Sequence, residues 1–176
     1  EAVSIPLMVQ DAPRSGVTLS VSLLAELART VDGVRYFKIE MPGTAAKLRA
    51  LIEAGGAAVE GPFDGEESIT LLADLDAGAT GTMPSALLPD LVKPVVDAYL
   101  AGDRPSAKAL YERILPLINY ENRQCGLRAT KAVMQAGGVI ESDAVRHPLV
   151  PLDAPTRAGL MELVNDLAPI ASRWGR

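Results

Sequence analysis

The chain has 176 residues, of which 48% are hydrophobic and 22% charged, a composition that excludes a disordered protein. Its net charge of −5 comes without a lysine or arginine cluster, which argues against a nucleic-acid-binding surface. The single cysteine, Cys125, excludes a disulfide framework and a cysteine-based zinc site. No apolar run reaches membrane-spanning length, so we expect a cytoplasmic protein without a membrane partner.

Short apolar runs alternate with segments of helical spacing along the first hundred residues. We expect strands at 3–9, 34–40, 57–61 and 80–83, and helices at 19–31, 44–54, 66–77 and 85–100. Thr44 is expected to cap the second of these helices, and Gly55-Gly56 to end it. Only helical patterns follow, at 105–120, at 123–136, and from a proline-containing loop at 146–155 to near Trp174.

The second expected strand carries the most informative residue, Lys38. Side chains alternate along a strand, so Tyr36, Lys38 and Glu40 share one face, and the apolar Phe37 and Ile39 share the other. Burial disfavours a charged amine, and a neutral amine condenses with a ketone to a Schiff base. The alternative is an edge lysine, or one whose stem reaches water.

Strands that alternate with helices indicate a parallel sheet with right-handed crossovers. A doubly wound sheet would need a glycine-rich phosphate loop after its first strand, which the sequence lacks. Polar or small residues end every expected strand, as in a (β/α)8 barrel, where functional residues lie at the carboxyl ends. A typical barrel has about 250 residues. We therefore expect half of a barrel at 1–100 and a helical extension at 101–176.

Four segments, in order, resemble the dihydrodipicolinate synthase and N-acetylneuraminate lyase superfamily. They are its Schiff-base strand, Tyr36-Phe37-Lys38-Ile39-Glu40, the loop after barrel strand five, 10–16, the turn after strand seven, 60–64, and strand eight, 78–85. The resemblance implies that this chain is the C-terminal portion, strands five to eight and the helical tail. It also implies a missing N-terminal half-barrel and a homo-oligomer, either a tetramer or a dimer.

Three further segments, 61–67, 119–123 and 146–149, resemble a subgroup that acts on 2-keto-3-deoxy sugar acids, the L-2-keto-3-deoxyarabonate dehydratases among them. The resemblance implies that Lys38 attacks the 2-keto group and that the resulting enamine expels the C4 hydroxyl as water. Carbon–carbon cleavage by an aldolase would use the same intermediate. A dihydrodipicolinate synthase is disfavoured, because the strand-five tyrosine of the family falls at Val9 or Gln10. An inactive half-barrel with a structural role is the non-enzymatic alternative.

Residues near the first strand end are candidates for substrate binding. Gln10 and Asp11 replace the tyrosine region and are expected to bind substrate hydroxyls or a water. Asp11 has the alternative of capping the following turn. Arg14 is expected to bind a carboxylate, since guanidinium groups match carboxylates, with a solvated loop arginine as the alternative.

Three more candidates come from the other strand ends. Glu40 is expected to transfer protons or bind a hydroxyl, unless it forms only a structural ion pair. Gly61 would let the main chain approach the substrate, or would simply be a turn glycine. Met83 corresponds to the family residue whose backbone faces the imine, and core packing is its alternative. The substrate is a small 2-keto acid, and Schiff-base chemistry needs neither a metal nor an organic cofactor.

Overall fold

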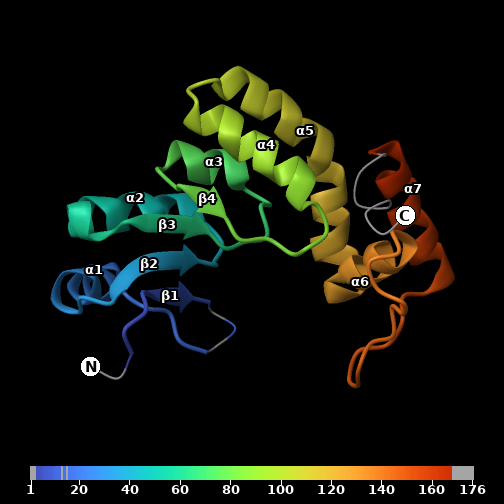
Figure 1. The fold of residues 1–176 in the computed structure, drawn as a ribbon, viewed down its shortest axis with the longest axis horizontal. Helices are drawn as coiled ribbons and strands as arrows, with labels where there is room; N and C mark the ends of the chain where they lie inside the picture. The colour runs from blue at the N-terminus through green and yellow to red at the C-terminus, as the bar shows by residue number, and fades with distance from the viewer. Residues whose placement is uncertain (1–2, 13, 15, 168–176) are drawn as a thin grey trace. The chain divides into compact units, whose positions relative to one another are not determined.

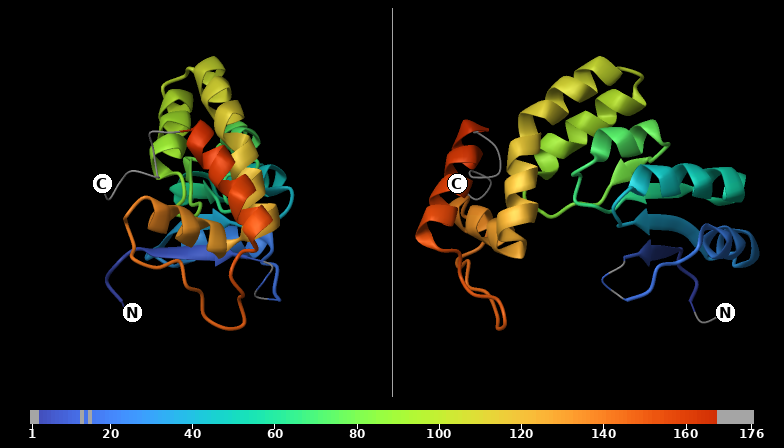
Figure 2. Two further views of the ribbon diagram at one scale, coloured as in Figure 1. Left: turned by 90° about the vertical axis from the view of Figure 1, so that its right-hand side faces the viewer. Right: turned by 180° about the vertical axis from the view of Figure 1, so that it is seen from behind.

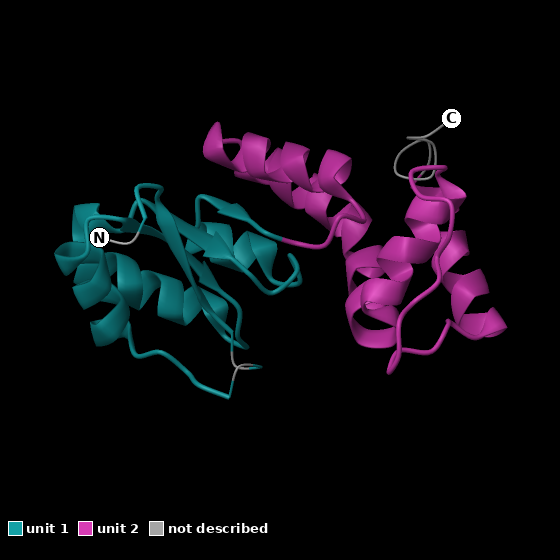
Figure 3. Ribbon diagram, turned by 60° about the horizontal axis from the view of Figure 1, so that its bottom comes forward, with its two compact units in different colours: residues 1–83 teal, residues 84–176 magenta. Residues whose placement is uncertain are grey.

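The computed structural model describes residues 3–12, 14 and 16–167. The chain forms two compact units, residues 1–83 and 84–176 (Figure 3). The first contains the sheet and the second contains only helices. The helix that ends at Leu100 belongs to the second unit by this division. The expected boundary at residue 100 concerns the complete barrel, and it stays a prediction.

The first unit is a four-stranded parallel sheet in the order β1-β2-β3-β4. Its strands are β1 (Leu7–Asp11), β2 (Val34–Ile39), β3 (Gly61–Asp64) and β4 (Gly81–Thr82). Its helices are α1 (Val21–Thr30), α2 (Thr44–Gly55) and α3 (Leu71–Asp76). Each helix connects two neighbouring strands, so the expected alternation of strands and helices is confirmed.

One face of this sheet is covered by α1, α2 and α3 (Figures 1 and 2). Phe37 and Ile39 of β2 are fully buried on that face, as are Leu24 of α1 and Leu48 of α2. The residue between the two strand positions, Lys38, remains partly exposed. The alternation predicted for this strand is therefore confirmed, and it separates an apolar helix-facing layer from a polar face.

The third strand was expected at 57–61 and this position was wrong. Ala57 and Ala58 lie in a 3-10 turn, and β3 begins at Gly61. A Cβ atom on Gly61 would lie 2.6 Å from the Tyr36 ring and 2.8 Å from the Phe63 ring. This glycine therefore marks close packing inside a strand, so the alternative expectation of a turn glycine was wrong.

One predicted helix start and one predicted helix cap were also wrong. The segment 66–70 is a turn, because Glu67 and Ser68 have positive φ angles of 56° and 63° and α3 starts only at Leu71. Thr44 is the first residue of α2 and not its cap, a position taken by Gly43 with φ 80°. The Thr44 hydroxyl donates instead to the carbonyl of Met41.

The second unit contains helices α4 to α7. They are α4 (Pro89–Leu100), α5 (Arg104–Tyr120), α6 (Leu127–Ala136) and α7 (Ala154–Asp166), with a π-helical turn, η3 (Glu121–Cys125), between α5 and α6. The helix expected at 123–136 is thus interrupted, because Gly126 has φ 61°. The expected end of the last helix near Trp174 lies outside the described residues. No helix in the described part is long and apolar enough to cross a membrane.

A buried carboxylate connects distant segments of the second unit. Glu121 is 5% exposed, and its Oε1 accepts hydrogen bonds from the hydroxyls of Ser85 and Thr130, the latter at 2.8 Å. The Ser85 hydroxyl also accepts the N–H of Leu87 at 3.2 Å. Because a buried carboxylate is costly without donors, these hydroxyls stabilise the turn that carries it.

Candidate active site

The polar face of β2 presents Lys38 at the carboxyl end of the sheet. Its Nζ lies 3.1 Å from Oε2 of Glu40, and the two side chains are 14% and 25% exposed. Gln10 of β1 pairs with Lys38 in the strand register, so its side chain lies on the same face. The Gln10 Nε2 donates to the same Glu40 Oε2 at 2.6 Å. We call Gln10, Lys38 and Glu40 the amine cluster.

The amine cluster combines a nucleophile with a proton acceptor. Glu40 follows the last residue of β2, and its N–H donates to the carbonyl of Asp11 at 2.9 Å, which continues the ladder with β1. Strand alternation then brings Lys38 and Glu40 to one face. An amine beside a carboxylate can both attack a carbonyl and exchange protons, provided that the amine is neutral at the moment of attack.

The end of β3 carries a buried acid, Asp64, which was not among the predicted site residues. Its Oδ1 accepts the N–H of Glu66 at 2.8 Å, and its Oδ2 accepts the N–H of Ser68 at 3.1 Å and the Thr82 hydroxyl at 2.6 Å. Burial raises the pKa of Asp64, and these hydrogen bonds and the charge of Lys38 oppose that shift. The signal in the sequence was an acid directly after a short apolar run.

Asp74 of α3 is fully buried close to that acid. Thr70 donates its hydroxyl to Oδ2 at 2.6 Å, while Oδ1 has no hydrogen-bond partner among the described residues. Burial raises the pKa of Asp74 to about 6, the Thr70 hydrogen bond opposes the rise, and the charge of Asp64 adds to it. An unsatisfied buried carboxylate favours its protonated form.

Asp11, a predicted substrate ligand, lies on the opposite face of the sheet from Lys38. It pairs with Ile39 in the register and is fully buried. Its Oδ1 accepts the N–H of Leu19 at 2.9 Å, and its Oδ2 forms an ion pair with Lys47 of α2. These contacts give Asp11 a structural role, closing the loop after β1, in place of the predicted substrate contact.

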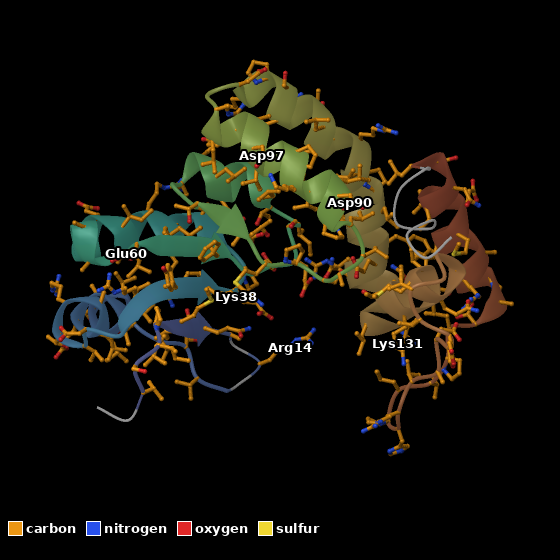
Figure 4. The ribbon with its side chains drawn as sticks, in the orientation of Figure 1. Arg14, Lys38, Glu60, Asp90, Asp97 and Lys131 are labelled. Carbon is orange, nitrogen blue, oxygen red and sulfur yellow. The ribbon has the colours of Figure 1, made fainter. Side chains whose placement is uncertain are left out.

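The other three predicted site residues, Arg14, Gly61 and Met83, come from three further segments of the first unit. Arg14 is exposed and extends from the loop after β1, at the end of the sheet where Lys38 lies (Figure 4). Gly61 starts β3 and pairs with Tyr36, whereas Lys38 is level with Phe63. The aromatic packing described above accounts for that glycine.

Met83 follows β4 and is 39% exposed. Its N–H donates to the carbonyl of Asp64 at 2.9 Å, which extends the ladder between β3 and β4. No group of three histidine, cysteine, aspartate or glutamate side chains in the described part of the chain is arranged to hold a metal ion.

A parallel sheet in sequential strand order, with helices on one face and a lysine at the carboxyl end of a strand, is the arrangement of one class of proteins, the (β/α)8 barrels, of which this chain supplies a part. The model of the dihydrodipicolinate synthetase family matches residues 1–167. The chain therefore belongs to that family, as the sequence motifs predicted.

Known relatives agree with this assignment. The chain is 53% identical over 174 residues to an L-2-keto-3-deoxyarabonate dehydratase of Azospirillum brasilense, covering 99% of this chain and 56% of the relative. It is 30% identical to a 4-hydroxy-tetrahydrodipicolinate synthase of Methanosarcina mazei, covering 95% of this chain and 56% of that enzyme. The chain thus spans little more than half the length of these relatives.

A solved structure agrees in fold. The crystal structure of the chloride-inhibited dihydrodipicolinate synthase of Acinetobacter baumannii with pyruvate superposes with a TM-score of 0.84 at 26% identity. The superposition covers 96% of this chain and 57% of that one. The prediction of a partial (β/α)8 barrel is therefore confirmed.

Proposed function

We propose that the whole protein is a lyase that dehydrates a 2-keto-3-deoxy sugar acid through a Schiff base on Lys38. The observation that carries the proposal is the amine cluster, in which Nζ of Lys38 lies 3.1 Å from a carboxylate oxygen of Glu40. The 53% identity to an L-2-keto-3-deoxyarabonate dehydratase supports the substrate class. The binding of pyruvate, itself a 2-keto acid, by a structural relative supports the same class.

The first stage of the proposed reaction forms the imine. The neutral amine of Lys38 adds to the C2 carbonyl of the substrate, and one water leaves as the C=N bond forms. The protonated imine withdraws electrons from C3 and so acidifies its hydrogens. Arg14 is proposed to bind the substrate carboxylate, because its exposed guanidinium lies at the same end of the sheet.

The second stage removes water from the substrate. The Glu40 carboxylate takes a C3 proton, and the electron pair of that C–H bond forms the enamine. The enamine then expels the C4 hydroxyl, which receives the proton from Glu40 and leaves as water. Another water hydrolyses the imine, which restores Lys38 and releases a 2-keto-3-ene acid, so the substrate has lost one water overall.

Gln10 is proposed to orient the Glu40 carboxylate during both stages of the reaction. Its amide donates to Glu40 Oε2 at 2.6 Å, the same oxygen that faces Lys38. Met83 is proposed to contribute main-chain surface near the substrate from its place after β4, whereas Gly61, at the start of β3, is proposed to take no part. We infer no direct part for Asp11, which the Lys47 ion pair holds on the other face.

A synthase or aldolase reaction is the second candidate, favoured by the 30% identity to a 4-hydroxy-tetrahydrodipicolinate synthase. It would share Lys38 and differ after the enamine, which would add to or release a carbonyl compound. For the whole protein we further propose a cytoplasmic homo-oligomer, a dimer or tetramer, whose barrel is completed by an N-terminal half.

Borohydride trapping tests the proposal. The chain is co-expressed with the N-terminal half of the Azospirillum brasilense dehydratase, an assembly that we call the completed barrel. After incubation with a 2-keto-3-deoxypentonate or with pyruvate and then borohydride, we expect a reduced adduct on the peptide that contains Lys38. Lys38→Met should abolish it and the surface variant Lys93→Met should retain it. An adduct on another lysine, or none on a folded completed barrel, would refute the Schiff-base assignment.

The product separates the two candidate reactions. Dehydration releases water from the pentonate and leaves its carbon count unchanged, as mass spectrometry of the small molecules would show. Release of pyruvate from the pentonate would instead establish an aldolase.

A further inference from the structure

The residue after β3, Gly65, lies in a space that leaves no room for a side chain. A Cβ atom there would lie 2.8 Å from Cγ of Lys38, 2.9 Å from Cβ of Glu40 and 2.9 Å from the carbonyl oxygen of Ile39. Contacts this short do not occur for real Cβ atoms. The bare main chain of Gly65 therefore lies directly against the stems of both reactive side chains.

Space, and not backbone conformation, accounts for a glycine at this position. The described glycines with positive φ include Gly43 and Gly78, but they do not include Gly65. An alanine could therefore adopt the backbone angles of residue 65, and only its methyl group would be excluded. This separates Gly65 from turn glycines, whose replacement strains the backbone itself.

The main chain of Gly65 is also held from both sides. Its N–H donates to the carbonyl of Ile39 at 2.8 Å, which fixes its distance from β2. On its other side, Asp64 accepts hydrogen bonds from the N–H groups of Glu66 and Ser68 and from the Thr82 hydroxyl. A shift of residue 65 away from β2 would weaken these bonds around a fully buried carboxylate, which is costly.

We propose that Gly65 is a positioning residue for the amine cluster. Its main chain supports the Lys38 and Glu40 stems from one side and so sets the 3.1 Å separation of Nζ and Oε2. The inference rests on the proposed function for the reaction that the separation serves. It goes further by assigning the separation to a residue that contributes no side chain.

A change in the separation of Lys38 and Glu40 would affect the two stages of the reaction differently. Imine formation needs only an accessible Lys38 amine, whereas elimination also needs Glu40 within reach of C3. A misplacement of about 1 Å can lower a rate roughly 100-fold. A methyl group at residue 65 should therefore slow dehydration far more than it slows adduct formation.

Gly65→Ala tests the proposal in the completed barrel, with Gly33→Ala as the matched control. A Cβ on Gly33 meets nothing nearer than 3.8 Å, so that variant adds the same methyl group without crowding. We expect Gly65→Ala to lower kcat for dehydration about 100-fold while the Lys38 adduct with pyruvate still forms. Gly33→Ala should match the parent in both assays.

A second readout is independent of activity. Crystal structures of the two variants should show the separation of Lys38 Nζ and Glu40 Oε2 increased in Gly65→Ala and unchanged in Gly33→Ala. An unchanged separation or an unchanged kcat in Gly65→Ala would overturn the inference, whereas absence of any Lys38 adduct in the parent protein would overturn the proposed function.

A variant that adds no volume covers the case in which Gly65→Ala does not fold. Thr82→Val keeps nearly the same side-chain shape and removes the hydroxyl that donates to Asp64. Loss of this hydrogen bond should loosen the corner formed by residues 64, 65 and 82. We expect a smaller loss of kcat with the adduct again retained. A parent-like kcat in a folded Thr82→Val protein would count against the corner as a positioning element.

Discussion

The proposed chemistry depends on Glu40 after imine formation. Its Oε2 accepts a hydrogen bond from the Gln10 amide and forms an ion pair with the Lys38 amine. Glu40→Gln keeps the size of the side chain and removes the proton acceptor. We expect dehydration to fall roughly 100- to 10,000-fold, the usual contribution of a general base. The pyruvate adduct on Lys38 should persist, because the amine is untouched.

Glu60→Gln is the control for that variant, since Glu60 is an exposed acid that forms an ion pair with Arg35 at 2.6 Å. Its activity should equal that of the parent. A Glu40→Gln protein with parent-like dehydration would show that another group takes the C3 proton.

Asp74 gives unit 1 an unusual dependence on pH. Its folded pKa of about 6 lies above the ordinary 3.8, so the folded state holds a proton that the unfolded state releases between these values. The contribution of Asp74 to the free energy of unfolding is therefore fully present below pH 3.8 and is lost as the pH rises through 6. Two pKa units correspond to roughly 3 kcal/mol, an upper bound on the loss.

Asp74→Asn removes this titration. Denaturant unfolding should find the variant more stable than the parent at pH 7, by up to about 3 kcal/mol, with the difference shrinking toward pH 4. Asp32→Asn, which replaces an exposed acid, is the control for the removal of one charge. A difference that is constant across this range would mean that Asp74 does not titrate there.

The sequence alone predicted the positions of some site residues correctly and missed the roles of others. The place of Lys38 and Glu40 on one face follows from strand period alone, and the structure has it so. Asp11 was expected in the loop after a strand at 3–9, but it ends β1 and pairs with Ile39, which puts it on the face opposite Lys38. Gly65 was missed because its role depends on neighbours from another strand, and spacing carries no such information.

At the scale of elements, α1 depends on one capping side chain. The Ser20 hydroxyl accepts the N–H of Leu23 at 3.2 Å, and the helix then buries Leu24. Ser20→Ala should lower the free energy of unfolding by about 1 kcal/mol, while Ser20→Asn should nearly restore it. Equal losses in both variants, measured by urea unfolding, would show that the hydroxyl does not act as a cap.

Elements with strong local signals were predicted well, and those defined by distant contacts were not. The range expected for the second strand, 34–40, is close to that of β2, because the apolar alternation there is local. The turn at 66–70 was expected to be helical, because its acids suit a helix start. Asp64 instead accepts two N–H groups of that turn, a competing arrangement that sequence periodicity does not contain.

At the scale of the whole molecule, the open edge of the sheet is the dominant feature of unit 1. Leu7 and Met8 of β1 are 37% and 40% exposed, although they are strand residues of an apolar run. A hollow of about 420 Å³ beside them is lined by residues 3–7 and 31–33, Arg35 and Tyr36. Unpaired apolar edges promote association, so the chain alone should self-associate.

Co-expression with an N-terminal half-barrel should suppress that association. Light scattering after size exclusion should then find a 1:1 complex of the two halves, alone or as a multiple, with a higher melting temperature than the chain alone. A chain that stays monomeric and ignores the half-barrel would contradict this expectation.

The carboxylate of Glu121 has a consequence for local opening in the second unit. It accepts hydrogen bonds from the hydroxyls of Ser85, before α4, and Thr130, in α6. The Ser85 hydroxyl in turn accepts a hydrogen bond from the N–H of Leu87. Amides that belong to one cooperative unit exchange with solvent at a common rate. The Leu87 amide should thus exchange together with those of α6, and a protease that cuts near Leu87 would report the unfolding of a helix far along the chain.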